Sequence, residues 1–438
     1  MDQFFDRYMT ALTQVERLPG PHLLRYQGGL VERLVRHARA HVPFYRDRLQ
    51  SLFGPDDAFD FSRWPQVPVL DRQEAAQANT RVSAPELPES YGVIHEITTS
   101  GTTGIPLSFS VNGLVSTAGN GALTLLARWH GMDTSRPLAM IKMYSAKDIP
   151  PMPEGFHGKG WSQASPDADT FGIDMRTPLD QQLVWLESRK APYLITSASH
   201  ATAIAYAAGA DRSRALGLEI IFSTAETVLA RARNIVRENF GAKLVALYSC
   251  QEIGMIAMEC PVSGQYHVII DNVLVEIVRP DGSLVAPGET GRVLVTGLYN
   301  YATPFIRYAI GDIATAAAEC CPCGRSLPLI EQIEGRTRAE FIFRDGTRIW
   351  PRALHAEAIR AFVPFREFQM VQVDHDVIEF RYIPQSGEHA PDLAGLKMYG
   401  RKNIHPSVDI RAITVVEFPR GRAGKHEHFL SLISDGSG

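Results

Sequence analysis

The sequence predicts an α/β protein in which a large domain over residues 1–334 precedes a small α+β domain over residues 335–438. Its 438 residues exceed the usual length of one domain, so we expect two units with separate cores. Between residues 194 and 247, helix-like and strand-like apolar runs alternate, which indicates a sheet flanked by helices. Past residue 265 the runs become short, with turns at Pro280-Asp281-Gly282 and Pro287-Gly288 between them. This second pattern predicts antiparallel sheet or a small β-barrel-like subdomain within the large domain.

The first predicted element is an amphipathic helix near the N-terminus. Apolar residues recur at helical spacing up to Val42-Pro43, where the proline lacks the N–H that would continue the helix. The recurring residues are Leu30, Leu34, Val35 and Ala38. We expect this apolar face to pack on the main body of the protein.

The core of the large domain is expected from the elements that follow. A Gly/Ala/Leu-rich run over Leu114–Leu126 predicts a buried helix. The alternating α/β elements are Leu194–Ser197, Ala201–Ala208, Glu219–Ser223, Thr227–Phe240 and Leu244–Leu247. The later β runs are Val273–Val278, Arg292–Thr296, Phe305–Tyr308 and Ile313–Ala317.

The small domain is predicted to follow Glu334-Gly335-Arg336. About a hundred residues remain beyond this point, enough for a compact α+β unit. Its expected elements are Phe341–Phe343, a turn at Asp345-Gly346, a helix around Ala353–Phe362, and strands near Met370–Val373 and Val377–Tyr382.

Composition and charge are those of an ordinary soluble protein. Hydrophobic residues make up 45% of the chain, charged residues 21%, and the net charge is −4, so bulk charge recruits no nucleic acid. The chain begins without the basic region and apolar core of a signal peptide, and no stretch approaches the roughly 18 apolar residues of a membrane span. The five cysteines are an odd number, and three lie within Cys320–Cys323. This usage fits a reducing compartment, so we expect a cytoplasmic protein without membrane or nucleic-acid partners.

The stretch Thr98-Thr99-Ser100-Gly101-Thr102-Thr103-Gly104 lies between the strand-like runs Val93–Ile97 and Leu107–Val111. Its residues are all glycine or hydroxyl-bearing, so they can place backbone N–H groups and hydroxyls around a phosphate. It is not a Walker A loop, because Ile105 follows the second glycine instead of the Lys-Ser/Thr pair. The alternative interpretation is a flexible Ser/Thr/Gly connection.

The cysteines provide a separate signal. Cys260 is followed seven residues later by His267 and then by the turn-forming Cys321-Pro322-Cys323-Gly324. Three thiolates and one imidazole satisfy a closed tetrahedral zinc site, which would be structural because it leaves no open position. Cys320 is an alternative ligand to Cys321, and reduced buried cysteines beside a chance histidine are the alternative to a metal.

Taken together, the phosphate loop, Tyr248-Ser249-Cys250-Gln251-Glu252 and Gly424-Lys425 resemble the adenylate-forming superfamily of acyl-CoA synthetases. Within it, the sequence is similar to the phenylacetate-CoA ligase branch and its capsule-biosynthesis-like relatives, over nearly its whole length. The resemblance implies a large domain that binds ATP and the acyl-adenylate and a small mobile C-terminal domain. It further implies that a carboxylate attacks the α-phosphate of ATP with Mg²⁺, and that the acyl-AMP then transfers its acyl group to coenzyme A. Some members of the branch carry a structural zinc at matching positions.

The resemblance assigns catalytic roles to three residues. Glu252 would bind Mg²⁺, Thr102 would hold the leaving pyrophosphate within the phosphate loop, and Lys425 would reach the α-phosphate and the acyl carboxylate. Tyr248 would lie against the adenine ring, and Asp312 would accept hydrogen bonds from both ribose hydroxyls. The nucleotide-binding residues implied are Thr99, Ser100, Gly101, Thr102, Thr103, Gly104, Ala225, Glu226, Tyr248, Ser249, Asp312 and Arg336.

Two positions depart from the family pattern. Ile105 replaces a lysine often found in the phosphate loop, and Arg338 stands at the hinge position usually held by Asp or Lys, next to Arg336. These departures keep two alternatives open. One is an adenylating enzyme that passes the acyl group to an amine or a carrier-protein thiol, and the other is a catalytically silent homologue that serves as a binding subunit.

The substrate is expected to be a small, aromatic carboxylic acid. Its pocket should come from the segments around Tyr144, Ser197–His200 and Ser223–Ala225, and we expect His200 to be a structural histidine with satisfied hydrogen bonds. Since relatives in the branch often pair, a homodimer is also expected.

Overall fold

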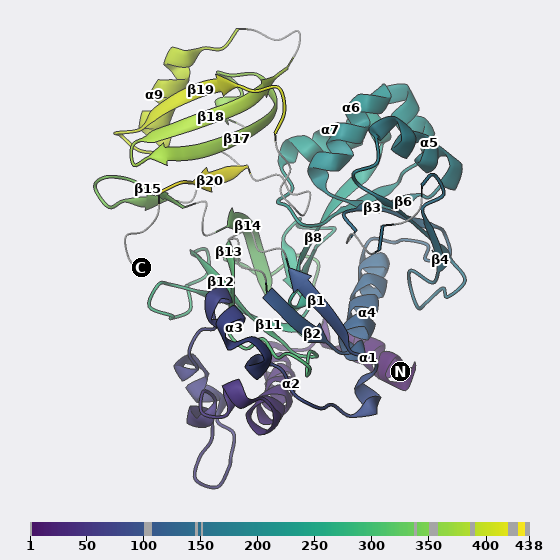
Figure 1. Cartoon of the computed structure of the whole chain (residues 1–438), viewed down its shortest axis with the longest axis vertical. Helices are drawn as coiled ribbons and strands as arrows, with labels where there is room; N and C mark the ends of the chain where they lie inside the picture. The colour runs from purple at the N-terminus through teal and green to yellow at the C-terminus, as the bar shows by residue number, and fades with distance from the viewer. Residues whose placement is uncertain are drawn as a thin grey trace. The chain divides into compact units, whose positions relative to one another are not determined.

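The computed structural model describes residues 2–99, 107–144, 148–149, 152–336, 340–349, 358–385, 390–418 and 428–433 (Figure 1). Contacts between residues divide the chain into two compact units. The first contains Met1–Val228, Ala232–Ile310 and Ala314–Gln332, and the second contains Leu229–Arg231, Gly311–Ile313 and Ile333–Gly438. The functional boundary expected between residues 334 and 335 stays a prediction.

The helices are concentrated in the first unit. The α-helices are α1 (Asp2–Val15), α2 (Gly20–His41), α3 (Arg72–Ala78), α4 (Gly113–Trp129), α5 (Leu179–Arg189), α6 (Ala198–Ala215), α7 (Ala230–Phe240) and α9 (Leu393–Asn403). Short 3₁₀ helices cover Pro43–Tyr45, Gln50–Leu52, Phe61–Gln66, Asn79–Val82 and Glu89–Tyr91. Within the described parts of the chain, no helix combines the length and apolar character that a bilayer span needs.

The strands of the first part of the chain are β1 (His95–Thr99), β2 (Leu107–Val111), β3 (Leu138–Lys142), β4 (Phe156–Lys159), β5 (Asp169–Asp174), β6 (Tyr193–Thr196), β7 (Ile220–Ser223), β8 (Lys243–Cys250), β9 (Gly254–Glu259) and β10 (Tyr266–Val268). They are followed by β11 (Val273–Val278), β12 (Thr290–Gly297), β13 (Tyr308–Ala316), β14 (Leu329–Arg336), β15 (Phe341–Ile342), β16 (Arg348–Ile349), β17 (Phe365–Asp374), β18 (Val377–Pro384), β19 (Asp409–Thr414) and β20 (Phe429–Ser431).

The large sheet has the strand order β11-β12-β13-β14-β10-β9-β8-β7-β6-β3-β5-β4. Strand β3 pairs in parallel with both β5 and β6, and β6, β7 and β8 continue in parallel. Helices α5, α6 and α7 lie against one face of this parallel half (Figure 1), where they form a common core with the sheet. The sheet contributes Ala139, Ile141, Phe171, Ile173, Leu194, Ile221 and Leu244 to that core. The α/β class predicted from the alternating pattern is therefore confirmed.

The second half of the sheet continues the parallel half through β8, which pairs antiparallel with β9. Strands β9 and β10, β10 and β14, and β11 and β12 are also antiparallel pairs. The strand expected at Ile313–Ala317 lies within β13 apart from its last residue, whereas the strand expected at Phe305–Tyr308 is wrong, because β13 begins only at Tyr308. Arg307 has a left-handed backbone (φ 48°), which interrupts extended structure just before β13. Its buried guanidinium binds Glu276 instead, at 3.0 Å.

The predicted amphipathic helix is confirmed as the second half of α2. Its buried residues are Leu23, Gln27, Leu30, Val31, Leu34, Val35 and Ala38. The Gln27 amide donates hydrogen bonds to the carbonyls of Ile270 (3.1 Å) and Val273 (3.0 Å), so a polar contact fixes the helix against the start of β11.

The second unit is a small α+β domain. Its sheet has the order β19-β18-β17-β20, in which β17 and β18 are antiparallel and β18 and β19 are parallel. Helix α9 covers this sheet, and the core contains Phe341, Phe368, Met370, Ile378, Phe380, Leu396 and Ile410. Half of the helix expected around Ala353–Phe362, residues 353–357, lies outside the described residues, and residues 358–359 are helical.

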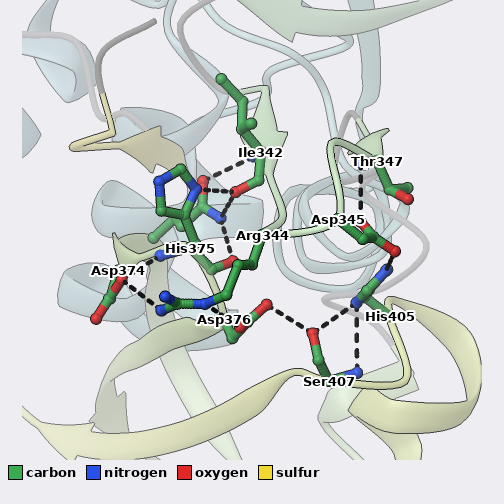
Figure 2. Close-up of polar contacts among 10 residues, drawn as sticks. Ile342, Arg344, Asp345, Thr347, Asp374, His375, Asp376, His405 and Ser407 are labelled. Carbon is green, nitrogen blue, oxygen red and sulfur yellow. Dashed lines mark hydrogen bonds and ion pairs between the residues drawn. The ribbon is translucent and has the colours of Figure 1, made fainter. Parts of the chain in front are cut away.

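A polar network joins three turns of the small domain (Figure 2). The Asp376 carboxylate accepts hydrogen bonds from the Ser407 hydroxyl at 2.6 Å and from Arg344 at 3.2 Å. His405 binds Ser407 through Nδ1 at 2.8 Å and Asp345 through Nε2 at 3.1 Å. The network therefore links the β15–β16 turn, the β17–β18 turn and the segment before β19.

Candidate functional site

The carboxyl ends of β3, β5, β6, β7 and β8 meet at one edge of the sheet, since these strands are parallel. The chain leaves β3 towards β4 and β5 on one side, whereas it leaves β6 through α6 towards β7 on the other. Adjacent strands whose connections diverge in this way form a crevice at their carboxyl ends, the usual ligand site of an open α/β sheet. The segments expected from the sequence to line a pocket, around Tyr144, Ser197–His200 and Ser223–Ala225, all follow these strand ends.

Glu252 lies in the turn that connects β8 with β9, and it is buried. Its Oε1 accepts a hydrogen bond from Arg72 Nη1 at 3.0 Å and another from the Tyr308 hydroxyl at 3.3 Å. Burial and the Glu252 carboxylate raise the pKa of Tyr308 well above its usual value, so this hydroxyl remains a donor. Tyr248 is buried near the end of β8, and Ser249 follows it at a shift in the strand register.

Arg72, which the sequence analysis did not single out, contacts two of the predicted site residues. Its second terminal nitrogen, Nη2, donates a hydrogen bond to the hydroxyl of Thr99. Thr99 ends β1 and pairs with Leu107 of β2, so it stands immediately before the predicted phosphate loop. One guanidinium therefore connects the start of that loop with the predicted Mg²⁺ ligand, Glu252.

A signal for Arg72 was present in the sequence. The residue is the first of α3, whose N-terminus is capped by Asp71 through a hydrogen bond to the Glu74 N–H at 2.7 Å. A cation is unfavourable in the first turn of a helix, because the helix dipole places positive charge there. A basic residue directly after a capping aspartate therefore indicates that its side chain binds an acceptor outside the helix.

The predicted adenine-side turn follows β7. Ala225 has a left-handed backbone (φ 73°), a conformation that costs a non-glycine residue about 1 kcal/mol or more. The next residue, Glu226, accepts a hydrogen bond from the Ser199 N–H at the start of α6. This hydrogen bond therefore joins the segments that follow β6 and β7.

His200, also in α6, binds Gln182 of α5 through Nε2 at 2.7 Å. It is buried, and this hydrogen bond supports the structural role expected for it.

The remaining predicted site residues fall into two groups. Asp312 is buried within β13, and Arg336 is the last residue of β14; both belong to the second compact unit. The phosphate-loop residues Ser100, Gly101, Thr102, Thr103 and Gly104, the adjacent Ile105, the hinge residue Arg338 and Lys425 lie outside the described residues.

The predicted cysteine–histidine cluster is assembled in the first unit. The ligand atoms of Cys260, His267, Cys321 and Cys323 all lie within 4.8 Å of one another. Cys260 Sγ is 3.5 Å from Cys321 Sγ, and His267 Nε2 is 3.2 Å from Cys323 Sγ. Cys320 is exposed and stands apart, so Cys321 is the member of the pair that joins the cluster.

The surroundings of the cluster suit a metal. Burial lowers the pKa of His267 to about 4, so its imidazole is neutral at physiological pH, as a metal ligand must be. Burial disfavours the Cys260 thiolate, but backbone N–H groups, including that of Val262 at 3.4 Å, lower its pKa overall. Three cysteine sulfurs and one imidazole at this spacing are a donor set that fits tetrahedral zinc.

The cluster is also connected to the N-terminal helix. Glu16, just beyond α1, is buried and accepts hydrogen bonds from Trp129 Nε1 at 2.8 Å and Arg128 at 2.9 Å, both in α4. Arg325, two residues after Cys323, lies 3.4 Å from the same carboxylate. Through Glu16, the Cys321–Cys323 segment is therefore connected to the end of α1 and to α4.

Solved structures of acyl-CoA ligases share the fold of this chain. A 2-hydroxyisobutyryl-CoA ligase in complex with 2-HIB-AMP matches over 96% of this chain and 91% of its own, with a TM-score of 0.78 and 20% identity. An anthranilate CoA ligase in complex with anthranoyl-AMP matches over 75% of this chain and 65% of its own, with a TM-score of 0.55 and 14% identity. The acetoacetyl-CoA synthetase from Streptomyces lividans matches over 76% and 53%, with a TM-score of 0.51 and 16% identity.

No protein-family model matches the chain, and no curated protein sequence matches it either. The likeness is thus one of architecture: along nearly its whole length, the chain has the fold of the adenylate-forming acyl-CoA ligases.

Proposed function

We propose that this protein is an ATP- and Mg²⁺-dependent ligase that converts a small carboxylic acid to an acyl-AMP and transfers the acyl group to coenzyme A. The observation that carries the proposal is the double contact of Arg72 with Thr99 and Glu252. This contact connects Thr99, at the start of the predicted phosphate loop, with Glu252, whose carboxylate is suited to Mg²⁺. The shared fold supports the same activity, because the similar ligases were solved with acyl-AMP or CoA.

In this proposal Glu252 offers the carboxylate oxygen that Mg²⁺ prefers. Thr99 and the following loop residues through Gly104, including Thr102, bind the pyrophosphate. The turn with Ala225 and Glu226 holds the adenine together with Tyr248 and Ser249. When bound, Mg²⁺ would neutralise charge on the phosphates, and Glu252 would hold it there.

Asp312, Arg336 and Lys425 belong to the second compact unit, and they are proposed to have the roles that the resemblance implies. Asp312 is suited to the ribose because its two carboxylate oxygens can accept two hydroxyl donors. Lys425 supplies a positive charge for the α-phosphate, and Arg336 adjoins the hinge about which the small domain moves. Ile105 removes the loop lysine, and the Arg72 guanidinium, which binds Thr99, offers a positive charge where the loop begins.

The acid is proposed to be aromatic. Tyr144 and Phe156 lie beside Gly172 at the carboxyl end of the sheet, and the Phe156 side chain is 45% exposed. Tyr144 follows the carboxyl end of β3, where its ring could offer an apolar face to an aromatic substrate.

Zinc is proposed as a structural ion bound by Cys260, His267, Cys321 and Cys323. Four protein ligands leave no position for substrate, so the ion would stabilise the fold and would not take part in catalysis. The homodimer expected from the resemblance stays a prediction, which the mass of the protein in solution tests.

ATP–pyrophosphate exchange with Mg²⁺ tests the proposed activity. We expect one class among aryl, arylacetic, hydroxy and amino acids to support exchange, and Lys425→Ala to abolish product formation. Mass analysis of products with CoA, a carrier protein and amines supplied in turn then identifies the acceptor. Background exchange across the panel, from folded protein that still binds ATP, would favour a silent binding subunit.

A further inference from the structure

Arg307 is buried immediately before β13 and binds two other parts of the first unit. Its guanidinium forms an ion pair with the buried Glu276 of β11, with Nη2 3.0 Å from Oε1. Through Nη1 it also donates hydrogen bonds to two backbone carbonyls, that of Pro65 at 3.0 Å and that of Val67 at 2.6 Å. Trp64 Nε1 donates to the same Glu276 carboxylate at 3.0 Å. One buried side chain therefore connects the stretch before α3 with β11 and with the start of β13.

The backbone of Arg307 continues this connection. Its carbonyl accepts a hydrogen bond from the Leu70 N–H at 3.0 Å, and the Leu70 carbonyl accepts one from the Ala309 N–H at 2.8 Å. These bonds place Leu70 beside Tyr308 in a parallel bridge. The Arg307 N–H donates to the Thr296 hydroxyl at 2.9 Å. A non-glycine residue keeps a left-handed backbone only where its surroundings fix it, and such residues are concentrated at functional sites.

The two segments that Arg307 connects each provide a hydrogen-bond donor to Glu252. Arg72 lies two residues after Leu70 and donates from Nη1 at 3.0 Å. Tyr308 donates from its hydroxyl at 3.3 Å. Both donors reach Oε1, whereas no residue in the described part of the chain donates to Oε2. Two donors on one oxygen fix the orientation of the carboxylate, and the second oxygen can bind a cation.

We propose that Arg307 is a positioning residue for Mg²⁺, which acts through Tyr308 and Arg72 on the orientation of Glu252. This inference rests on the proposed function, in which Glu252 binds Mg²⁺ at the phosphates of ATP. The Arg307 guanidinium binds β11 and the carbonyls of residues 65 and 67, so its effect on the metal passes through the two donors to Glu252. Replacing a residue that orients a metal ligand typically changes metal affinity roughly 10–100-fold.

Arg307→Lys tests the role of the guanidinium. Lysine keeps a positive charge for Glu276 but lacks the planar group that binds an acid and two carbonyls together. With ATP held constant, the Mg²⁺ concentration for half-maximal ATP–pyrophosphate exchange should rise by about tenfold. The value of kcat at saturating Mg²⁺ should change by less than about threefold. A merely structural role would instead lower kcat through loss of folded protein and leave the Mg²⁺ requirement unchanged.

Two further variants act on the same connection. Glu276→Gln removes the charge that Arg307 pairs with and keeps the shape of the side chain, so it should raise the Mg²⁺ requirement as well. Tyr308→Phe removes one donor to Glu252 and should do the same. Because Arg307 acts partly through Tyr308, the double variant Arg307→Lys/Tyr308→Phe should raise the requirement by less than the product of the two single changes.

Arg233→Lys is the matched control. Arg233 also binds a buried acid and a backbone carbonyl, since its two terminal nitrogens contact Glu259 at 2.9 and 2.8 Å and Nη1 donates to the Leu244 carbonyl. These contacts include neither donor to Glu252. The control should therefore lower stability in denaturant unfolding, as Arg307→Lys does, but should keep the Mg²⁺ requirement of the parent.

Calorimetry of ATP binding to the full chain, with and without Mg²⁺, gives a readout that needs no acid. Mg²⁺ should tighten ATP binding in the parent and in Arg233→Lys, and roughly tenfold less in Arg307→Lys. This difference in the absence of any exchange would support the positioning role and refute the ligase. An unchanged Mg²⁺ requirement in Arg307→Lys, or an equal shift in Arg233→Lys, would overturn the positioning role and leave the ligase intact. Parent protein that shows neither exchange nor an effect of Mg²⁺ on ATP binding would count against both.

Discussion

Arg72 and Glu252 form an ion pair between residues 180 positions apart in the sequence, with Nη1 of the arginine 3.0 Å from Oε1 of the acid. The glutamate is buried and the arginine is mostly covered, so the two charges depend on each other. Since the same guanidinium also binds Thr99, one side chain connects the β8–β9 turn with the strand that leads into the phosphate loop.

Arg72→Met should destabilise the protein by about 1–3 kcal/mol, because it leaves a buried carboxylate without its charged partner. The change should also lower exchange activity more than Arg72→Lys does, since lysine keeps the charge but lacks the two separate nitrogens with which the guanidinium binds Glu252 and Thr99. Denaturant unfolding and exchange kinetics measure the two effects. Arg63→Met, at an exposed pair with Asp60, serves as the control and should shift stability by less than about 1 kcal/mol. Equal behaviour of the two methionine variants would contradict a special role for Arg72.

Metal analysis should find about one zinc per chain, and a strong chelator should lower the melting temperature. Cys323→Ser should lose the metal and unfold earlier, because it removes one of four ligands. The matched control is Cys320→Ser, three positions away but exposed and outside the cluster, which should retain the zinc and the melting temperature. Full metal content in Cys323→Ser would show that the cluster is not the site.

Asp271→Asn should stabilise the protein at neutral pH. Burial raises the pKa of this carboxyl to about 6 from an ordinary 3.8, although Tyr26 donates a hydrogen bond to it at 2.5 Å. Because the folded-state pKa is the higher one, the carboxyl costs stability as the pH rises through this interval, and the cost is complete above about pH 6. At 1.36 kcal/mol per pKa unit, the gain is at most about 3 kcal/mol.

Unfolding curves at pH 4, 6 and 8 measure this effect. The advantage of Asp271→Asn should be smallest at pH 4 and largest at pH 8, whereas Asp211→Asn, at an exposed position in α6, should show no such trend. A variant less stable than the parent at every pH would refute the interpretation.

The polar network of the small domain should weaken in acid (Figure 2). The hydrogen bond from Ser407 is the main cause that lowers the pKa of Asp376 below 3.8, and Thr347 lowers that of Asp345 in the same way. Their stabilisation is therefore present above about pH 3.8 and is lost as the pH falls through the lower folded-state values. Hydrogen exchange over residues 405–409 should show protection at pH 6 that declines below pH 4. Asp376→Asn should remove most of this pH dependence. The same pH profile of hydrogen exchange in the variant and the parent would contradict a role of Asp376 in the network.

The site residues that could be predicted from the sequence were those that belong to short local motifs. The four zinc-ligand candidates come from two short motifs, Cys260/His267 and Cys321/Cys323. Glu252 belongs to a separate short motif, Tyr248–Glu252. Arg72 was missed because its two partners, the end of β1 and the β8–β9 turn, lie 27 and 180 residues along the chain. Asp271 was missed because its pKa depends on burial beneath α2. The choice between Cys320 and Cys321 also needed the fold, since their spacings to any distant partner differ by only one residue. The elements of the parallel half of the sheet could be predicted from their own hydrophobic patterns. The start of β13 could not, because the left-handed backbone of Arg307 is not visible in the hydrophobic pattern.

The contact between Trp129 and the cysteine–histidine cluster gives the protein an internal optical probe. The indole and imidazole rings of Trp129 and His267 are nearly perpendicular, with ring centres 5.5 Å apart. The indole N–H donates a hydrogen bond to Glu16, and the Arg325 guanidinium lies over the face of the indole ring. Any rearrangement of the Cys321–Cys323 segment therefore changes both the polarity and the hydrogen bonding around one tryptophan. Because the chain has five tryptophans, the difference in fluorescence between the parent and Trp129→Phe would report the state of the cluster without any added label.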